Sequence, residues 1–387
     1  MPLIRRTLGV VVVVASVLAA ATGAAATDWR QFRSDAAQSG ANTAETALTP
    51  ATVGGLAPAW TKALGDHVQW PAPLVVGDET IISSVSTVAA FSTSTGRRLW
   101  SFSSPAGFLS NPIAANSSAV FVSPDEGPAF ALDLTTGVLL WQRDLGGSYG
   151  GGPTVTGGVV YVPGGIRLYA LDPATGATRW SVVASQNAAT NISTPAVSGG
   201  SIVVNTAFGV RAFSQATGAA VWTQTFGRFN DTGVAIADEA VFAAAGRQQV
   251  KLDLVTGDVI WRKWLRRGND SVSTPAVGGG IVALHVERND PRREVVIARS
   301  ADTGERLWSV GYAAGNTRGF PESSPAIASG VVYMGFMAAE VRALDATTGK
   351  ELWASALDGD ALSSPSVANG QLEIGTYAGS LYAFRLP

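Results

Sequence analysis

One sequence element, Thr-Gly followed four residues after the glycine by Trp, occurs seven times in this chain of 387 residues. The seven pairs are Gly96/Trp100, Gly137/Trp141, Gly176/Trp180, Gly218/Trp222, Gly257/Trp261, Gly304/Trp308 and Gly349/Trp353. Trp60 stands one interval earlier without its Thr-Gly, and successive tryptophans are 39 to 47 residues apart. A period near 40 residues is the length of one propeller blade and indicates a ring of repeated sheets.

Each repeat is expected to hold four short strands. In the seventh repeat, residues 324–327, 331–334, 341–345 and 351–353 are runs of β-branched and aromatic residues separated by Gly-containing turns. The inner strands are predicted to start at Pro73, Pro112, Pro153, Pro195, Val234, Pro275, Pro325 and Pro365. The sequence therefore predicts an all-β, eight-bladed β-propeller of four-stranded antiparallel blades.

The two ends of the chain carry complementary half-units. The last repeat stops at residues 383–387 without an outer strand, whereas the strand at 60–64 has no unit before it. We expect the ring to close by mixing N- and C-terminal strands in one blade. The predicted organisation is a signal peptide at 1–26, an N-terminal arm at 27–58 and the propeller at 59–387.

The first 26 residues resemble an export signal. Arg5 and Arg6 precede an apolar run of about 14 residues and the small residues Ala24–Ala26, a pattern typical of secretory signal peptides. The apolar run is shorter than the roughly 20 residues that span a bilayer. The predicted mature protein is soluble, without a transmembrane segment, and secreted or periplasmic.

Composition excludes some partners and some chemistry. Lys and Arg total 27 against 29 acidic residues, so the chain lacks the basic excess that nucleic-acid binding requires. There is no cysteine, which excludes disulfides and thiolate metal sites. With 46% hydrophobic and 14% charged residues, the chain can bury a large core.

The repeat Ala-x-Asp-x-x-Thr-Gly-x-x-x-Trp resembles the tryptophan-docking repeat of the pyrroloquinoline-quinone (PQQ) propeller superfamily, over about residues 28–387. That superfamily contains quinoprotein alcohol dehydrogenases and also the outer-membrane assembly factor BamB, which binds no quinone. The resemblance implies a blade-docking role for Trp60, Trp100, Trp141, Trp180, Trp222, Trp261, Trp308 and Trp353.

Loops that join each outer strand to the next inner strand are expected to gather on one face, around a central funnel. Convergent polar and aromatic groups in such a place are typical of a binding site. The candidate ligand-binding residues are Trp70, Asn111, Asn191, Asp231, Asn269, Asp270, Arg318 and Glu322. Because polar residues are also ordinary in loops, the same positions are compatible with no binding role, and no catalytic pair can be singled out.

A quinoprotein would need Ca²⁺ ligands, and the resemblance also implies adjacent cysteines, which are absent. Asp231 with Asn230, or Asp270 with Asn269, could offer oxygen ligands to Ca²⁺, but such pairs are also ordinary loop residues. No metal site and no cofactor are therefore predicted, with PQQ plus Ca²⁺ kept as the alternative.

Two further features are interpreted as structural. His285 lies within an expected strand and is predicted to be half buried. The charged segment 287–294 is predicted to be a solvated hairpin tip, with a partner-binding role as the alternative.

The sequence favours a monomeric, non-catalytic binding or scaffold module for a protein or a cell-surface polymer. The alternatives are a PQQ-dependent alcohol or sugar dehydrogenase and a BamB-like assembly scaffold, the latter weakened because a lipidation cysteine is missing.

Overall fold

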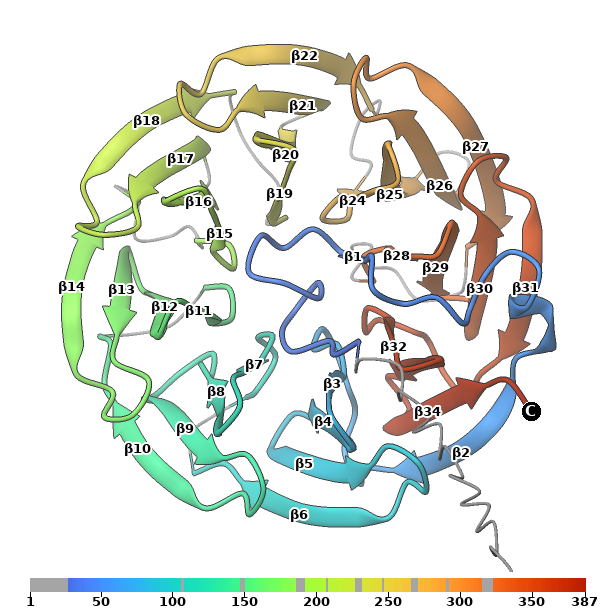
Figure 1. Ribbon diagram of the computed structural model, residues 1–387, viewed down its shortest axis with the longest axis horizontal. Coiled ribbons are helices and arrows are strands. Elements are labelled where there is room, and N and C mark those ends of the chain that lie inside the picture. The colour runs from blue at the N-terminus through green and yellow to red at the C-terminus, as the bar shows by residue number, and fades with distance from the viewer. Residues whose placement is uncertain are drawn as a thin grey trace, which may run out of the picture.

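Eight sheets stand around a central axis, as the repeat period predicts (Figure 1). The computed structural model describes residues 27–105, 108–146, 150–185, 192–206, 208–226, 232–245, 247–265, 271–289, 292–314 and 323–387. The prediction of an eight-bladed propeller is confirmed. We number the blades 1 to 8 in the order of their innermost strands, so that blade 1 contains β3 and blade 8 contains β32.

The innermost strands are short, and each begins at or within three residues of its predicted start. They are β3 (Leu74–Val76), β7 (Ala114–Ala115), β11 (Thr154–Thr156), β15 (Ala196–Ser198), β19 (Val234–Ala237), β24 (Ala276–Gly278), β28 (Ala326–Ala328) and β32 (Ser366–Ala368). Another short strand, β23 (Ser271–Val272), pairs beside β24 with the same partner in blade 6.

The two middle strands of each blade are buried on both faces and rich in Val, Ile, Phe and Ala. The second strands are β4 (Glu79–Ser83), β8 (Ala119–Val122), β12 (Val159–Gly164), β16 (Ser201–Thr206), β20 (Ala240–Ala245), β25 (Ile281–Asn289), β29 (Val331–Phe336) and β33 (Gln371–Gly375). The third strands are β5 (Thr87–Ser92), β9 (Ala129–Asp133), β13 (Arg167–Leu171), β17 (Gly209–Ser214), β21 (Gln248–Asp253), β26 (Arg292–Ser300), β30 (Glu340–Asp345) and β34 (Ser380–Arg385).

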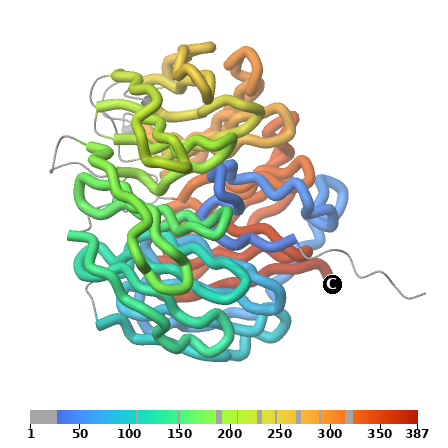
Figure 2. The backbone as a smooth tube through the Cα atoms, turned by 60° about the vertical axis from the view of Figure 1, so that its left-hand side comes forward, coloured from blue at the N-terminus to red at the C-terminus, as the bar shows by residue number. Residues whose placement is uncertain are grey.

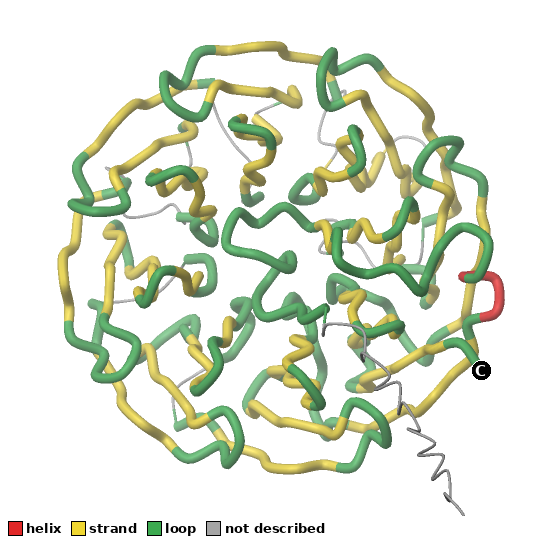
Figure 3. The backbone as a smooth tube through the Cα atoms, viewed as in Figure 1, coloured by secondary structure: helices red, strands yellow, loops and turns green. Residues whose placement is uncertain are grey.

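The outer strands form the circumference of the disc. They are β6 (Arg98–Ser103), β10 (Leu139–Arg143), β14 (Thr178–Val183), β18 (Ala220–Thr225), β22 (Val259–Trp264), β27 (Arg306–Ala313), β31 (Glu351–Ala356) and β2 (Ala57–Ala63). The eighth outer strand, β2, comes from the N-terminal side of the chain and pairs antiparallel with β34, so both ends of the chain share blade 8. In the described part the only helical turn is η1 (Val53–Gly55), at the outer edge (Figure 3).

Tryptophans of the repeat join neighbouring blades. Trp100 in blade 1 packs on Gly137 in the turn of blade 2, where an added Cβ would lie 2.5 Å from the indole Cε3. Gly137 also has φ +70°, which L side chains avoid. The Trp100 indole N–H donates to the carbonyl of Leu134 at 2.8 Å. The recurring spacing thus pairs each tryptophan ring with the glycine turn of the next blade.

The same contact recurs around the ring. Indole N–H groups donate across blades at 2.8–3.1 Å from Trp60, Trp100, Trp141, Trp222, Trp261, Trp308 and Trp353. The Trp180 ring packs against Gly218 in the same way, since a Cβ there would lie 2.6 Å from it. These rings, with the apolar faces of the middle strands, make the core a series of clusters between adjacent blades.

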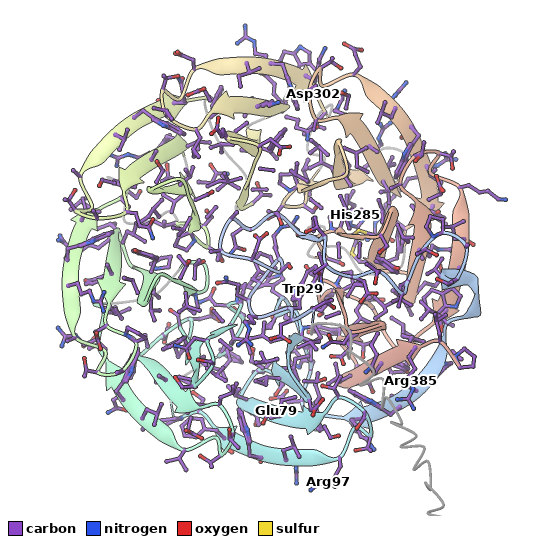
Figure 4. The ribbon with its side chains drawn as sticks, viewed as in Figure 1. Trp29, Glu79, Arg97, His285, Asp302 and Arg385 are labelled. Atoms are coloured by element: carbon purple, nitrogen blue, oxygen red, sulfur yellow. The ribbon has the colours of Figure 1, made fainter. Side chains whose placement is uncertain are left out.

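The segment from Thr27 to Asn42 winds through the centre of the ring, and Trp29 lies near the axis (Figures 1 and 4). Its backbone bonds to the innermost strands in blade order. Trp29 exchanges two bonds with Val75, and the carbonyls of Arg30, Ala36, Ala37, Ser39 and Gly40 accept from Ala115, Val197, Ile236, Val277 and Ile327. The segment ends in β1 (Ala41–Asn42), which runs parallel to β28.

Side chains of the segment reach the two remaining blades. Gln31 accepts from the Val155 amide at 3.0 Å in blade 3, and Asn42 donates to the Val367 carbonyl at 2.9 Å in blade 8. All eight innermost strands are therefore held by one stretch of about sixteen residues. In the turned view of Figure 2 this blue stretch lies toward the side of the disc that carries the C-terminus.

Arg33 is buried inside this central segment. Its guanidinium donates to the carbonyls of Pro275 and Pro325, in blades 6 and 7, and to that of Gln38. Burial lowers the pKa of Arg33 to about 9, and the Asp35 carboxylate opposes that shift. At neutral pH the group keeps its charge and links two blades through the arm.

Candidate functional site

The candidate ligand-binding residues fall into two groups. Asn191, Asp231, Asn269, Asp270, Arg318 and Glu322 lie outside the described residues. Trp70 lies on the loop from β2 to β3 and is 39% exposed, so its ring is accessible. Asn111 is buried, and its side-chain amide donates to the Ser123 carbonyl at 3.1 Å. Asn111 therefore fixes the loop that follows β6.

Three exposed aromatic side chains lie on one face of the disc, in blades 8, 1 and 2. They are Trp70, Phe108 on the loop from β6 to β7, and Tyr377 on the turn between β33 and β34, with exposures of 39%, 65% and 45%. In an antiparallel blade, the second-to-third turn lies at the same end as the outer-to-inner loop. The three rings consequently share a face, which we call the loop face.

Hydrogen bonds connect these loops into a continuous row. The ring of His67 contacts that of Tyr377, with centroids 4.7 Å apart. The Val85 amide donates to the His67 carbonyl at 3.2 Å, and the Leu109 amide donates to the Val85 carbonyl at 2.9 Å. The loops of blades 8, 1 and 2 thus hold one another, and we call His67, Trp70, Phe108 and Tyr377 the rim patch.

The segments around the rim patch carry acids but no Lys or Arg. Residues 64–73, 104–113, 123–128, 357–362 and 376–379 contain Asp66, Asp125, Glu126, Asp358 and Asp360. Burial raises the pKa of Asp125, opposed by hydrogen bonds from Ser110. Asp358 accepts from the Thr376 hydroxyl at 2.8 Å. The rim patch is therefore aromatic with acidic surroundings, which suits a partner with apolar and basic side chains.

Tyr377 was missed in the sequence because only outer-to-inner loops were considered. A signal was present, since Tyr377 precedes Ala-Gly in a turn between two strand-like runs. Aromatic residues in such second-to-third turns face the same side as the loops that were inspected.

His285 and the charged hairpin correct two expectations. His285 is fully buried, with Nε2 3.2 Å from a Glu294 carboxylate oxygen and Nδ1 3.3 Å from the Ser323 carbonyl. Glu287 and Glu294 are also buried, facing each other across β25 and β26. The prediction of a solvated tip was wrong for these two acids, because the long hairpin packs its polar side chains against blade 7. The Met337 amide there donates to Glu294 at 3.1 Å.

The described residues do not supply a donor set for a quinone cofactor with its cation. Among them, no group of three or more His, Cys, Asp or Glu side chains is placed to hold a metal ion. The Asn-Asp pairs at 230–231 and 269–270 lie outside the described residues. No catalytic step through a quinone is therefore derived from this geometry. Within the described ranges, no helix is long and apolar enough to cross a membrane.

Comparison with known proteins places this geometry in context. The family model described as outer membrane protein assembly factor BamB matches residues 19–148, 125–209 and 206–387. A curated BamB from Yersinia pestis is 26% identical over 351 residues, covering 84% of this chain and 86% of that protein.

Solved structures share the fold. Quinohemoprotein alcohol dehydrogenase from Comamonas testosteroni superposes with a TM-score of 0.78 at 16% identity, covering 93% of this chain and 82% of that one. BamB from Moraxella catarrhalis gives a TM-score of 0.67 at 19% identity, covering 85% of this chain and 99% of that one. At such identities these likenesses establish the architecture alone.

Proposed function

The chain belongs to the family of the outer membrane protein assembly factor BamB, and from that premise we propose that it is a non-catalytic, extracytoplasmic scaffold for a partner protein. The observation that carries the proposal is the rim patch. Trp70, Phe108 and Tyr377 expose their rings on one face, beside several carboxylates. Exposed aromatic residues are enriched where proteins bind one another.

The rest of the loop network supports a preformed surface. The hydrogen bonds among His67, Val85 and Leu109 fix the row before any partner arrives, which lowers the entropy cost of binding. The expected partner segment carries aliphatic or aromatic side chains together with Lys or Arg. A protein is favoured over a cell-surface polymer because of the family to which the chain belongs.

Photo-crosslinking in the producing cells tests the proposal. A photoreactive phenylalanine analogue replaces Phe108 or Tyr377 in the full chain, and the control carries it at Val255, which is 72% exposed in the turn of blade 5. One discrete protein should crosslink from positions 108 and 377 but not from 255, and Phe108→Ser should reduce the yield from 377 at least about tenfold. Equal crosslinking from all three positions, or retention on purified envelope polysaccharide without any protein crosslink, would overturn the proposal.

A second candidate, a quinoprotein dehydrogenase, is favoured by the fold similarity to quinohemoprotein alcohol dehydrogenase. It needs a quinone site and a bound cation, and the candidate cation ligands from the sequence, Asp231 and Asp270 with their neighbouring asparagines, lie outside the described residues. A cofactor titration, given in the Discussion, separates this candidate from the scaffold.

A further inference from the structure

A cavity of about 190 Å³ opens at the side of the disc, between the outer strand of blade 8 and the sheet of blade 1. Apolar side chains line part of it, and polar side chains provide most of the exposed lining. The apolar lining residues are Ala63, Leu64, Ile82, Ala89 and Phe91, and the polar ones are Ser84, Thr87, Arg98, Ser101 and Ser103. It is separate from the rim patch, which lies on the loop face.

The cavity exists because blade 1 has a small residue where the other blades have larger ones. The strand register allows one position to be compared in all eight blades, namely the residue immediately before the one that pairs with the docking tryptophan. In blades 1 to 8 it holds Ala89, Phe130, Tyr169, Arg211, Val250, Ile297, Arg342 and Tyr382. Only Ala89 lacks a side chain long enough to fill the gap between blades.

The filled positions show what kind of group this space accepts. In blade 3, the Tyr169 hydroxyl donates to the Leu145 carbonyl at 3.0 Å, at the end of the preceding outer strand. In blade 8, the Tyr382 hydroxyl accepts from the Asp358 amide at 3.1 Å. Leu145 is four residues after Trp141, just as Leu64 is four residues after Trp60. The cavity thus corresponds to the space that a phenol ring occupies in two sister blades.

The cavity also has a positively charged end. The guanidinium of Arg98 makes no ion pair or side-chain hydrogen bond with any described residue. Arg98 starts β6 and Ser103 ends it, so the cation and the hydroxyls of Ser103 and Thr87 line different ends of the cavity. Arg98 is exposed to solvent and lines the cavity, and a guanidinium without a counter-ion is suited to bind a carboxylate.

The size agrees with one substituted ring. A closed apolar cavity of about 150 Å³ binds benzene, and the present cavity is somewhat larger, although it is open to solvent and more of its exposed lining is polar than apolar. The apolar lining residues would contact the ring, while the hydroxyls and the arginine would contact polar substituents at opposite positions.

We propose that the cavity between blades 8 and 1 binds a small phenolic carboxylate, a single aromatic ring with a hydroxyl at one end and a carboxylate at the other. The Ala89 gap accepts the ring, Arg98 pairs with the carboxylate, and the hydroxyl lies at the end bordered by Leu64 and Ser103. This site is independent of the proposed scaffold function, because it uses none of the rim-patch residues.

Ligand-detected NMR with 4-hydroxybenzoate as the probe tests the proposal on the full mature chain. Ala89→Tyr, which restores the residue found in blades 3 and 8, should abolish binding while the melting temperature stays equal or rises. Arg98→Gln should weaken binding at least about tenfold. The matched control, Arg97→Gln, removes the same charge from the neighbouring residue at the perimeter (Figure 4), which does not line the cavity, and should leave binding unchanged.

Comparison of probes checks the chemistry of each end. Phenol should bind more weakly than 4-hydroxybenzoate to the natural chain. Its affinity should be the same for Arg98→Gln as for the natural chain, because phenol has no carboxylate to pair with Arg98. If Ala89→Tyr folds poorly, Ser101→Leu serves as a second filling variant. Absence of binding up to about 10 mM, or binding that survives both filling variants, would overturn the proposal.

Discussion

The indole nitrogen of Trp353 lies 3.0 Å from the carbonyl oxygen of Leu56, a residue 297 positions earlier in the chain. For Trp60, Trp100, Trp141, Trp222, Trp261 and Trp308 this bond goes to a turn between the third and outer strands of the next blade. Blade 8 has no such turn, because its third strand ends at Arg385 and its outer strand begins at Ala57. The η1 turn at Val53–Gly55, just before β2, takes the place of the missing turn. Trp353 therefore docks at the point where the N-terminal and C-terminal strands meet in blade 8.

Substitution of Gly137 can separate two costs, the clash with the Trp100 ring and the strain of a positive φ. Gly137→Ala should destabilise the fold by about 3 kcal/mol, because the new Cβ meets the Trp100 ring and the backbone has φ +70°. Gly158→Ala is the matched control, since Gly158 has the same φ and nothing within 4 Å of an added Cβ. It should cost only about 1 kcal/mol. Urea denaturation of both variants measures the difference, and equal losses would contradict the docking role.

Removal of the Trp222 indole measures how much one docking tryptophan stabilises the fold. Trp222→Ala should lower the free energy of unfolding by about 3 kcal/mol, as for a large aromatic removed from a packed site, and it also leaves the Leu254 carbonyl without its indole donor. Val221→Ala, at an exposed position next to it, should change stability by less than about 0.5 kcal/mol. Thermal and urea unfolding distinguish the two. Similar midpoints for both variants would show that Trp222 does not hold blades together.

Glu373 gives the fold a pH dependence. The side chain is fully buried between blades 8 and 1, and burial raises its pKa to about 8, despite a hydrogen bond from the Thr80 hydroxyl at 2.8 Å. The native state keeps the proton that the unfolded chain releases near its ordinary pKa. The group's contribution to stability is therefore complete at low pH and falls as pH rises toward about 8.

Glu373→Gln should remove that dependence. Relative to the natural chain, the variant should gain about 2.5 kcal/mol between pH 5.5 and 7.5, since each pH unit in this window is worth up to about 1.4 kcal/mol. Urea unfolding at several pH values provides the comparison. Parallel pH profiles for the two proteins would mean that Glu373 is ionised in the folded state.

Cofactor titration separates the scaffold from the quinoprotein. The purified mature chain should give no dye-linked oxidation of alcohols or aldoses with PQQ and Ca²⁺, because the sequence has no adjacent cysteines to cover a bound quinone. Quinone absorbance and dye reduction are followed with and without Ca²⁺. Stoichiometric PQQ binding with turnover that is lost in Asp231→Ala and Asp270→Ala would establish the dehydrogenase.

The ring of eight blades could be predicted from the sequence because the contacts between blades need particular residue types, a glycine in the turn and a tryptophan that packs on it. The Thr-Gly turn and the tryptophan recur, so blade number, strand order and closure follow from spacing. Burial of Glu287 and Glu294 was not predictable in the same way, because it depends on the neighbouring blade and not on local charge. The Ala89 gap does leave a signal, which appears only when the eight repeats are aligned by strand register.

The path of the arm, residues 27–42, through the centre of the propeller could not be predicted from its residues. Arg30, Ala36, Ala37, Ser39 and Gly40 bind the blades through backbone carbonyls, which every residue has. Gln31, Arg33, Gln38 and Asn42 use side chains as well, and Asp28 accepts from the Gly77 amide, but none of these residues forms a known motif. Polar residues after a signal-like segment look like a linker, and the sequence offered no reason to place them in the central channel.

This central segment also constrains the order of events during synthesis. Residues 27–42 leave the ribosome before any blade, yet their partners appear one after another up to Val367 in blade 8. The segment cannot complete its contacts until the innermost strand of blade 8 has emerged. A segment synthesised ahead of all the blades therefore makes its last contact only after all eight innermost strands exist.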